Sequence, residues 1–231
     1  MLDRVRHCDD AALAESPFGA AVRYALRRAD APPDYELRPE ELALLPERAV
    51  AKRRKEFRLG RTAAHHALRG LLPGPPGPIL RRESREPVWP AGVVGAITHA
   101  GEIGAAAVAW QGDHAGLGLD IEERHRDVGL DVVRMICREP EARWVREVAA
   151  QAELRLKMVF SAKESIFKAF YPREQIWLGF EDAELQWCED RRAFAATLLK
   201  AAGGRYPVGY VLTVECCLSE HYLMTWTALP P

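Results

Sequence analysis

Apolar residues recur at helical spacing between residues 46 and 72. Val50, Phe57, Ala64 and Leu68 repeat at a period near that of a helix, and basic residues fill the gaps. This pattern predicts a helix over residues 46–72. The run of Pro and Gly at residues 73–78 ends it, since proline lacks the amide hydrogen that a helix interior needs.

Strand patterns follow in the middle of the chain. Two apolar runs, residues 93–98 and 103–110, are separated by a short segment containing glycine, which predicts a β-hairpin. In residues 116–122, Leu117, Leu119 and Ile121 alternate with Gly118, Asp120 and Glu122. A period of two predicts a strand, and it places the two carboxylates on the same face.

The second half repeats the order of helix and then strand. Residues 139–150 and 154–170 have helical patterns, and we expect the second helix to end at Tyr171-Pro172, because a residue before proline disfavours helix. Residues 210–217 and 222–228 are rich in β-branched and aromatic side chains, which predicts a terminal hairpin. The fold class predicted is α+β with two related lobes.

Composition excludes several classes of protein. With 48% hydrophobic and 28% charged residues, the chain is typical of a globular protein with a buried core. A net charge of -1 argues against a partner such as duplex DNA, whose binding proteins usually carry a broad positive field. The five scattered cysteines contain no CxxC pair, and no segment resembles a signal peptide or a membrane span, so we expect a cytoplasmic protein without membrane attachment.

The predicted strand over 116–122 carries a candidate cation site. Asp120 and Glu122 stand roughly 6.6 to 7 Å apart on one face, close enough to approach one hard cation together. Magnesium favours such oxygen ligands and commonly combines one or two carboxylates with substrate phosphates. The alternative is that both carboxylates are solvated on the polar face of a sheet, which is the commoner role of charged residues.

A second candidate lies on the predicted helix over 154–170. Ser161, Glu164 and Lys168 fall on one helical face by their spacings of three and four residues. Two structural alternatives stay open: Ser161 with Glu164 has the form of a capping box, and Glu164 with Lys168 has the form of a surface ion pair. The apolar periodicity continues into Ser161 without a break, and this favours one continuous helix over the capping box.

Basic residues form a third group. Arg53 and Arg61 on the first predicted helix could bind phosphate oxygens through their guanidinium groups, or they could belong to a solvated cationic face. Thr98 and His99 end a predicted strand beside a turn, where side chains often project into a cleft. The chain has neither a P-loop nor a glycine-rich dinucleotide fingerprint.

In their order and spacing, these segments resemble those of the Sfp-type 4'-phosphopantetheinyl transferases, closest to the branch that contains enterobactin synthase component D. The matching segments, over roughly residues 45–185, are Arg53-Arg54-Lys55-Glu56-Phe57-Arg58-Leu59-Gly60-Arg61, Pro87-Val88-Trp89-Pro90, Gly95-Ala96-Ile97-Thr98-His99, Gly118-Leu119-Asp120-Ile121-Glu122, Phe160-Ser161-Ala162-Lys163-Glu164-Ser165-Ile166-Phe167-Lys168 and Trp177-Leu178-Gly179-Phe180. Ala96 departs from the serine expected there.

The resemblance implies a specific site and fold. It implies two lobes related by a pseudo-twofold axis, each a small antiparallel sheet packed with helices: residues 1–112, which would bind coenzyme A, and residues 113–231, with the metal site and the catalytic helix. Magnesium would be held by Asp120, Glu122 and Glu164. Coenzyme A would be bound by residues of both lobes: Arg53, Arg61, Arg85, Thr98, His99, Lys163 and Lys168.

The resemblance also implies the reaction. A serine of an acyl- or peptidyl-carrier protein would attack coenzyme A and release adenosine 3',5'-bisphosphate, with Glu164 and Lys168 as catalytic residues in a monomeric enzyme. The alternatives are a non-catalytic module that binds coenzyme A or a carrier protein, and a magnesium-dependent phosphohydrolase. The presence of Asp120, Glu122 and Glu164 argues against a non-catalytic module. The chain has no extended positively charged surface pattern for nucleic acid, and this argues against a nuclease.

Overall fold

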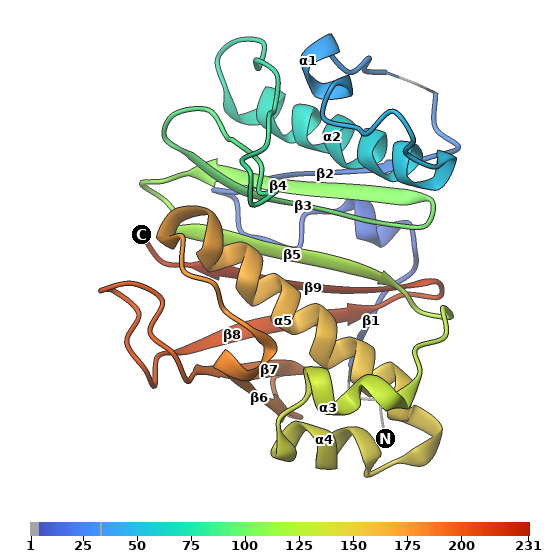
Figure 1. Cartoon of the computed structure of the whole chain (residues 1–231), viewed down its shortest axis with the longest axis vertical. Coiled ribbons are helices and arrows are strands. Elements are labelled where there is room, and N and C mark those ends of the chain that lie inside the picture. The colour runs from blue at the N-terminus through green and yellow to red at the C-terminus, as the bar shows by residue number, and fades with distance from the viewer. Residues whose placement is uncertain (1–4, 33) are drawn as a thin grey trace.

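The computed structural model describes residues 5–32 and 34–231, and its two sheets lie one beside the other (Figure 1). The N-terminal sheet has the order β2-β4-β3, and helix α2 covers one of its faces. The bounds of these elements are Arg23–Arg28 for β2, Val93–Ala100 for β3, Ile103–Trp110 for β4, Pro39–Leu42 for α1 and Ala51–Leu71 for α2. All pairs in this sheet are antiparallel.

The C-terminal sheet has the order β5-β9-β8-β7-β6, and the long helix α5 runs across it. The strands are Gly116–Glu123 (β5), Ala183–Cys188 (β6), Ala193–Leu198 (β7), Val211–Leu218 (β8) and Tyr222–Leu229 (β9), and the helices are Val133–Ile136 (α3), Glu139–Arg146 (α4) and Ala152–Glu174 (α5). Short 3₁₀ turns occupy Ala12–Ala14, Leu130–Val132, Ala149–Gln151 and Phe180–Asp182. The predicted α+β class is confirmed.

One strand crosses from the first half of the chain to the second sheet. Strand β1, Arg6–His7, pairs in parallel with β8, next to Cys217 and Leu218. The predicted N-terminal lobe, residues 1–112, therefore contributes a strand to the C-terminal sheet; its residues 1–4 and 33 lie outside the described residues. The division of the chain near residue 112 stays a prediction.

The two sheets share a hydrophobic core. On one face of β5, Leu117, Leu119 and Ile121 are buried against residues of β3 and β4, such as Ala96 and Ala107. Strand β3 is an edge strand of the N-terminal sheet, and β5 is an edge strand of the C-terminal sheet. The two strands lie next to each other but are not paired in one sheet. This shared core fixes the end of β3 beside the end of β5.

Glycines bring α5 close to the opposite face of β5. A Cβ at Gly116 would lie 2.0 Å from the carbonyl oxygen of Ala169, and one at Gly118 would lie 1.9 Å from that of Ser165. Only residues without a Cβ allow this approach of helix backbone to strand backbone. The same face of β5 continues to Asp120, which is therefore covered by α5 and buried.

The predicted helix end at Tyr171-Pro172 is wrong. Helix α5 includes Pro172 and continues to Glu174, and Gln175 then terminates it in the left-handed conformation at φ 54°. Because Pro172 lies in the last turn, it removes only one backbone hydrogen bond, and the amide of Gln175 still bonds to the carbonyl oxygen of Tyr171 at 2.9 Å.

Candidate active site between the two sheets

Asp120 is the centre of the site. It lies near the end of β5 and is 5% exposed. Its carboxylate accepts hydrogen bonds from Lys168 Nζ at 2.6 Å, Ser161 Oγ at 2.7 Å and Thr98 Oγ1 at 3.3 Å. Two of these donors come from α5 and one from β3, so the carboxylate is fixed in place by both lobes.

Two further carboxyl groups lie close enough to Asp120 to be affected by its charge. Burial, and then the neighbouring Asp120, raise the pKa of Glu122 to about 7. Burial and Asp120 also raise the pKa of Glu164, although Lys168 opposes this shift. Burial alone would lower the pKa of Lys168, but Asp120 and Glu164 raise it. These carboxyl groups therefore form an acidic cluster around one ammonium group.

The acidic cluster supplies the oxygen donors that magnesium prefers, but its side chains are not arranged around a common point. Within residues 5–32 and 34–231, no three His, Cys, Asp or Glu side chains are already grouped as metal ligands. Lys168 and Ser161 engage the two oxygens of Asp120 instead. The oxygen donors of Asp120, Glu122 and Glu164 fit magnesium by type, and the raised pKa values of Glu122 and Glu164 show that a further positive charge would stabilise their ionised forms.

A second group of side chains forms a basic pocket of about 140 Å³ beside the end of β3. The structure brings together four residues singled out from the sequence, and it adds Arg81, which sequence reasoning missed although it lies in a basic loop. The arginine and histidine side chains lining the pocket are Arg53, Arg61, Arg81, Arg85 and His99.

Electrostatics in this basic pocket favour an anion. Arg53 Nη1 lies 3.1 Å from His99 Nε2, and burial, Arg53 and Lys168 lower the pKa of that imidazole although Glu56 opposes them. Burial lowers the pKa of Arg61 to about 10, so this guanidinium is still charged at neutral pH. An anion such as a phosphate would relieve the crowding of these positive groups.

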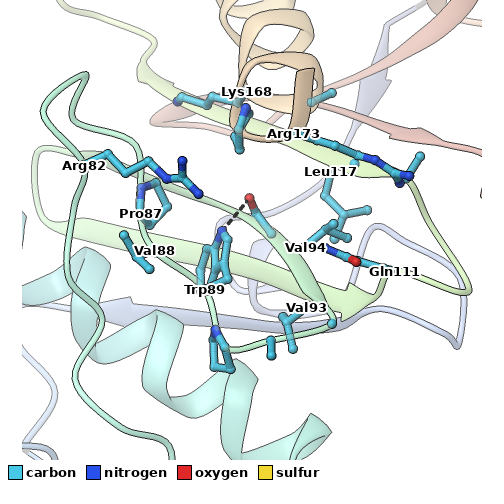
Figure 2. Close-up of a pocket in the computed structure, with 18 residues that line it drawn as sticks. Arg82, Pro87, Val88, Trp89, Val93, Val94, Gln111, Leu117, Lys168 and Arg173 are labelled. Carbon is cyan, nitrogen blue, oxygen red and sulfur yellow. Dashed lines mark hydrogen bonds between the residues drawn. The ribbon is translucent and has the colours of Figure 1, made fainter. Parts of the chain in front are cut away.

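Larger cavities adjoin the acidic cluster. One of about 320 Å³ lies between the lobes, with Trp89 in its middle and Arg82, Lys168 and Arg173 around it (Figure 2). The indole of Trp89 donates a hydrogen bond to the carbonyl oxygen of Gly95, drawn as a dashed line in Figure 2. A second cavity, of about 360 Å³, is lined by Glu164 and by aromatic side chains that include Phe167 and Trp177.

The structure does not bring Lys163 to the phosphate-binding side. Its side chain is 3% exposed, and Nζ donates to Glu141 at 2.7 Å and to the carbonyl oxygens of Ile136 at 2.9 Å and Phe180 at 2.6 Å. All donor hydrogens of the ammonium are used in these contacts. The expectation that Lys163 neutralises a diphosphate is corrected: the residue ties α5 to its neighbours.

The mid-helical position of Ser161 decides between the open alternatives at this motif. Ser161 lies inside α5 and bonds to Asp120 and to Thr225 Oγ1 at 2.9 Å, so it does not cap a helix. Thr225 on β9 also meets Ser165 and was not anticipated, because its distance in the chain hides the contact. Lys168 pairs with Asp120, across the helix–strand interface.

Comparison with known proteins places these features in one family. A family model described as 4'-phosphopantetheinyl transferase N-terminal domain matches residues 39–109, and one described as 4'-phosphopantetheinyl transferase superfamily matches residues 116–225. The chain is 39% identical over 199 residues to 4'-phosphopantetheinyl transferase Svp of Streptomyces mobaraensis, across 84% of this chain and 80% of that protein.

Two further relatives agree. Identity to 4'-phosphopantetheinyl transferase PptT of Mycobacterium tuberculosis is 36% over 159 residues, or 69% of each chain. Identity to enterobactin synthase component D of Salmonella austin is 33% over 137 residues, or 59% of this chain and 56% of the relative. The chain belongs to the 4'-phosphopantetheinyl transferase superfamily, as its motifs predict.

Proposed function

We propose that this enzyme transfers the 4'-phosphopantetheine arm of coenzyme A to a carrier-protein serine at the acidic cluster, with the basic pocket binding the nucleotide end. Membership of the transferase family supports the reaction. The single observation that supports the location is the buried Asp120, held by Lys168 and Thr98 beside two carboxyl groups of raised pKa.

Asp120, Glu122 and Glu164 are the residues that we expect to hold magnesium. When bound, the ion would neutralise phosphate charge that develops as the pyrophosphate linkage breaks. Thr98 and Ser161 keep the Asp120 carboxylate in a fixed orientation through their hydroxyl groups. Lys168 already lies at this carboxylate, and its ammonium would bind the diphosphate and stabilise the departing phosphate.

The basic pocket would bind the adenosine 3'-phosphate. Arg53, Arg61, Arg85 and His99 line it and lie beside the β3 end that supplies Thr98. Guanidinium groups bind phosphate oxygens through paired N–H donors, so this pocket would fix the substrate without taking part in bond breaking.

Glu164 is our candidate for the general base. Its pKa is raised by burial and by Asp120, which brings the carboxylate closer to the range in which it can accept a proton near neutral pH. The carrier serine would lose its hydroxyl proton to Glu164, directly or through a water molecule, as its oxygen attacks the β-phosphorus. Adenosine 3',5'-bisphosphate would leave.

The partner in this proposal is an acyl- or peptidyl-carrier protein, and the enzyme would act as a cytoplasmic monomer. No helix within the described ranges is both long and apolar enough to cross a bilayer. The net charge of -1 favours a protein or small-molecule partner over nucleic acid.

The test is a transfer assay with the full chain, coenzyme A, Mg²⁺ and an apo-carrier protein, read by intact mass spectrometry. We expect the carrier to gain one phosphopantetheine group, and Asp120→Asn to abolish the gain. Asp113→Asn, on an exposed turn, is the matched control and should transfer as wild type does. Coenzyme A binding without transfer would indicate a non-catalytic module, and its hydrolysis without carrier modification would indicate a phosphohydrolase; either result contradicts the proposal.

A further inference from the structure

Glu41 is a completely buried carboxylate outside the acidic cluster. One oxygen lies 2.8 Å from His65 Nε2 and accepts the backbone N–H of Ile79 at 3.1 Å. The other accepts the backbone N–H of Arg38 at 3.1 Å and the hydroxyl of Tyr35 at 3.4 Å. These contacts join α1, helix α2 and the segment that begins at residue 79.

Glu141 has the same arrangement in the C-terminal lobe. It accepts the backbone N–H of Arg138 at 2.6 Å, that of Leu185 at 2.7 Å and the ammonium of Lys163 at 2.7 Å. Both glutamates close the first turn of a short helix, hold a distant backbone amide and pair with the long helix of their lobe. The two sites differ in where the distant segment leads, and Glu141 leads to strand β6.

The segment held by Glu41 leads into the basic pocket. Residues 73–78 include four prolines, which have no backbone N–H. Ile79 is the first residue after this loop, and its backbone N–H is the one that Glu41 binds. The next residue, Leu80, accepts Arg61 Nη2 at 3.4 Å, and Arg81 and Arg85 follow. Arg85 sits at φ 78°, a left-handed conformation that an ordinary residue keeps only in a well-fixed loop.

A further bond holds the same loop. The guanidinium of Arg38 donates through Nη2 to the carbonyl oxygen of Pro76 at 2.8 Å. Glu41 and Arg38 therefore hold residues 76–79 immediately before Leu80, whose carbonyl oxygen also accepts the backbone N–H of Val88 at 3.0 Å. Among the described residues, Leu80 accepts the single hydrogen bond of the buried Arg61 guanidinium, which also lies over the Phe57 ring.

We propose that Glu41 is a positioning residue for the nucleotide end of coenzyme A: through Ile79 it places Leu80, Arg61 and Arg81 so that they converge on one phosphate. This inference rests on the proposed function of the basic pocket. Glu41 itself does not touch the ligand, since it is fully buried. Residues that orient contact residues in this way commonly change affinity although they make no contact themselves.

The test compares Glu41→Gln with Glu141→Gln in the full chain. Titration calorimetry gives the Kd of adenosine 3',5'-bisphosphate, and thermal unfolding gives Tm. Both variants lose a buried charge, a helix cap and a partner on the long helix, so both should lower Tm. We expect Glu41→Gln to weaken binding about tenfold, with kcat at saturating coenzyme A changed less than about twofold, whereas Glu141→Gln leaves the Kd within about twofold of wild type.

A Glu41→Gln variant that loses Tm but binds the bisphosphate as wild type does overturns the proposal. If this variant does not fold, Arg38→Ala tests the same loop through its bond to Pro76, and it should weaken binding by a smaller factor; wild-type affinity there also overturns the proposal. Failure of the wild-type enzyme to modify any carrier would instead concern the proposed reaction, because the calorimetric Kd needs no turnover.

Discussion

At the scale of single residues, burial changes the protonation of Glu122 in the acidic cluster. Its pKa is raised to about 7 by burial and by Asp120, far above its ordinary value of 4.5. Between these two values, the folded protein keeps a proton on Glu122 that the unfolded chain releases. Glu122 therefore makes the free energy of unfolding fall as the pH rises through this window.

This shift predicts a pH-dependent stability of the metal-free protein. With a chelator present, we compare the unfolding free energy of wild type with that of Glu122→Gln. The wild-type value minus the variant value should fall as pH rises from about 5 to about 7.5, because only wild type gains the buried charge. Urea unfolding at several pH values measures it. A wild-type and variant pair with parallel pH profiles would contradict the raised pKa.

At the same scale, the spacing of Ser161 and Lys168 correctly predicted that they share a helical face, whereas the family resemblance misplaced Lys163. The two residues seven positions apart share a helical face, and both bond to Asp120. Lys163 precedes Glu164 by one position, which rotates its side chain about 100° around the helix, toward Glu141. A motif shows which residues recur together, but the direction of each side chain follows from the helix.

At the scale of elements, the strand–helix pair β5 and α5 determines the site. The alternation of residues 116–122 predicted β5 and the shared face of Asp120 and Glu122. The alternation did not predict that this face is buried. A glycine in a strand can either simply weaken the strand or mark a place where another backbone comes close, and the sequence does not distinguish these roles for Gly116 and Gly118. Strands β2, β6 and β7 were missed. The arginines of β2 and Glu184 of β6 obscure the period of two, whereas β7 is a short, almost uniformly apolar run that shows no alternation.

Gly118→Ala tests the close approach. A Cβ at residue 118 would lie 1.9 Å from the carbonyl oxygen of Ser165, so α5 must move away from β5 and take Ser161 and Lys168 with it. We expect a loss of about 1–3 kcal/mol in unfolding free energy, as for other overpacked sites, and a clear fall in kcat.

Gly112→Ala is the matched control, since nothing lies within 4 Å of its added Cβ. Denaturant unfolding and the carrier-modification rate measure both variants. A Gly118→Ala enzyme with wild-type unfolding free energy and transfer rate would contradict the prediction, because it would show that α5 and β5 can move apart without loss of stability or activity.

At the scale of the whole molecule, two sheets meet edge to edge through a shared core and through polar links between their side chains. Thr98 is one such link: its hydroxyl accepts the backbone N–H of Ile121 at 3.1 Å and donates to Asp120. The sequence predicted both strands, but it could not predict that the ends of β3 and β5 are neighbours. That contact depends on how the two sheets pack, and no local pattern encodes it.

Thr98→Val should weaken this link. The amide of Ile121 would be left buried without its partner, which costs about 1–3 kcal/mol of unfolding free energy, and Asp120 would lose one donor, so kcat should fall as well. Thr98→Ser keeps the hydroxyl and should behave as wild type in both urea unfolding and turnover. Equal stability of the Val and Ser variants would show that the hydroxyl does not join the lobes.

Strand β1 has a consequence for any attempt to recombine this enzyme with its relatives. Its residues begin the described chain yet complete the sheet of the opposite lobe beside Cys217 and Leu218, where Cys8 also bonds through its amide to the carbonyl oxygen of Leu218. A chimaera joined near residue 112 would take strand β1 from one parent and its pairing partner, strand β8, from the other. The natural unit of exchange is therefore a discontinuous one, the second half together with the segment around residues 5–8.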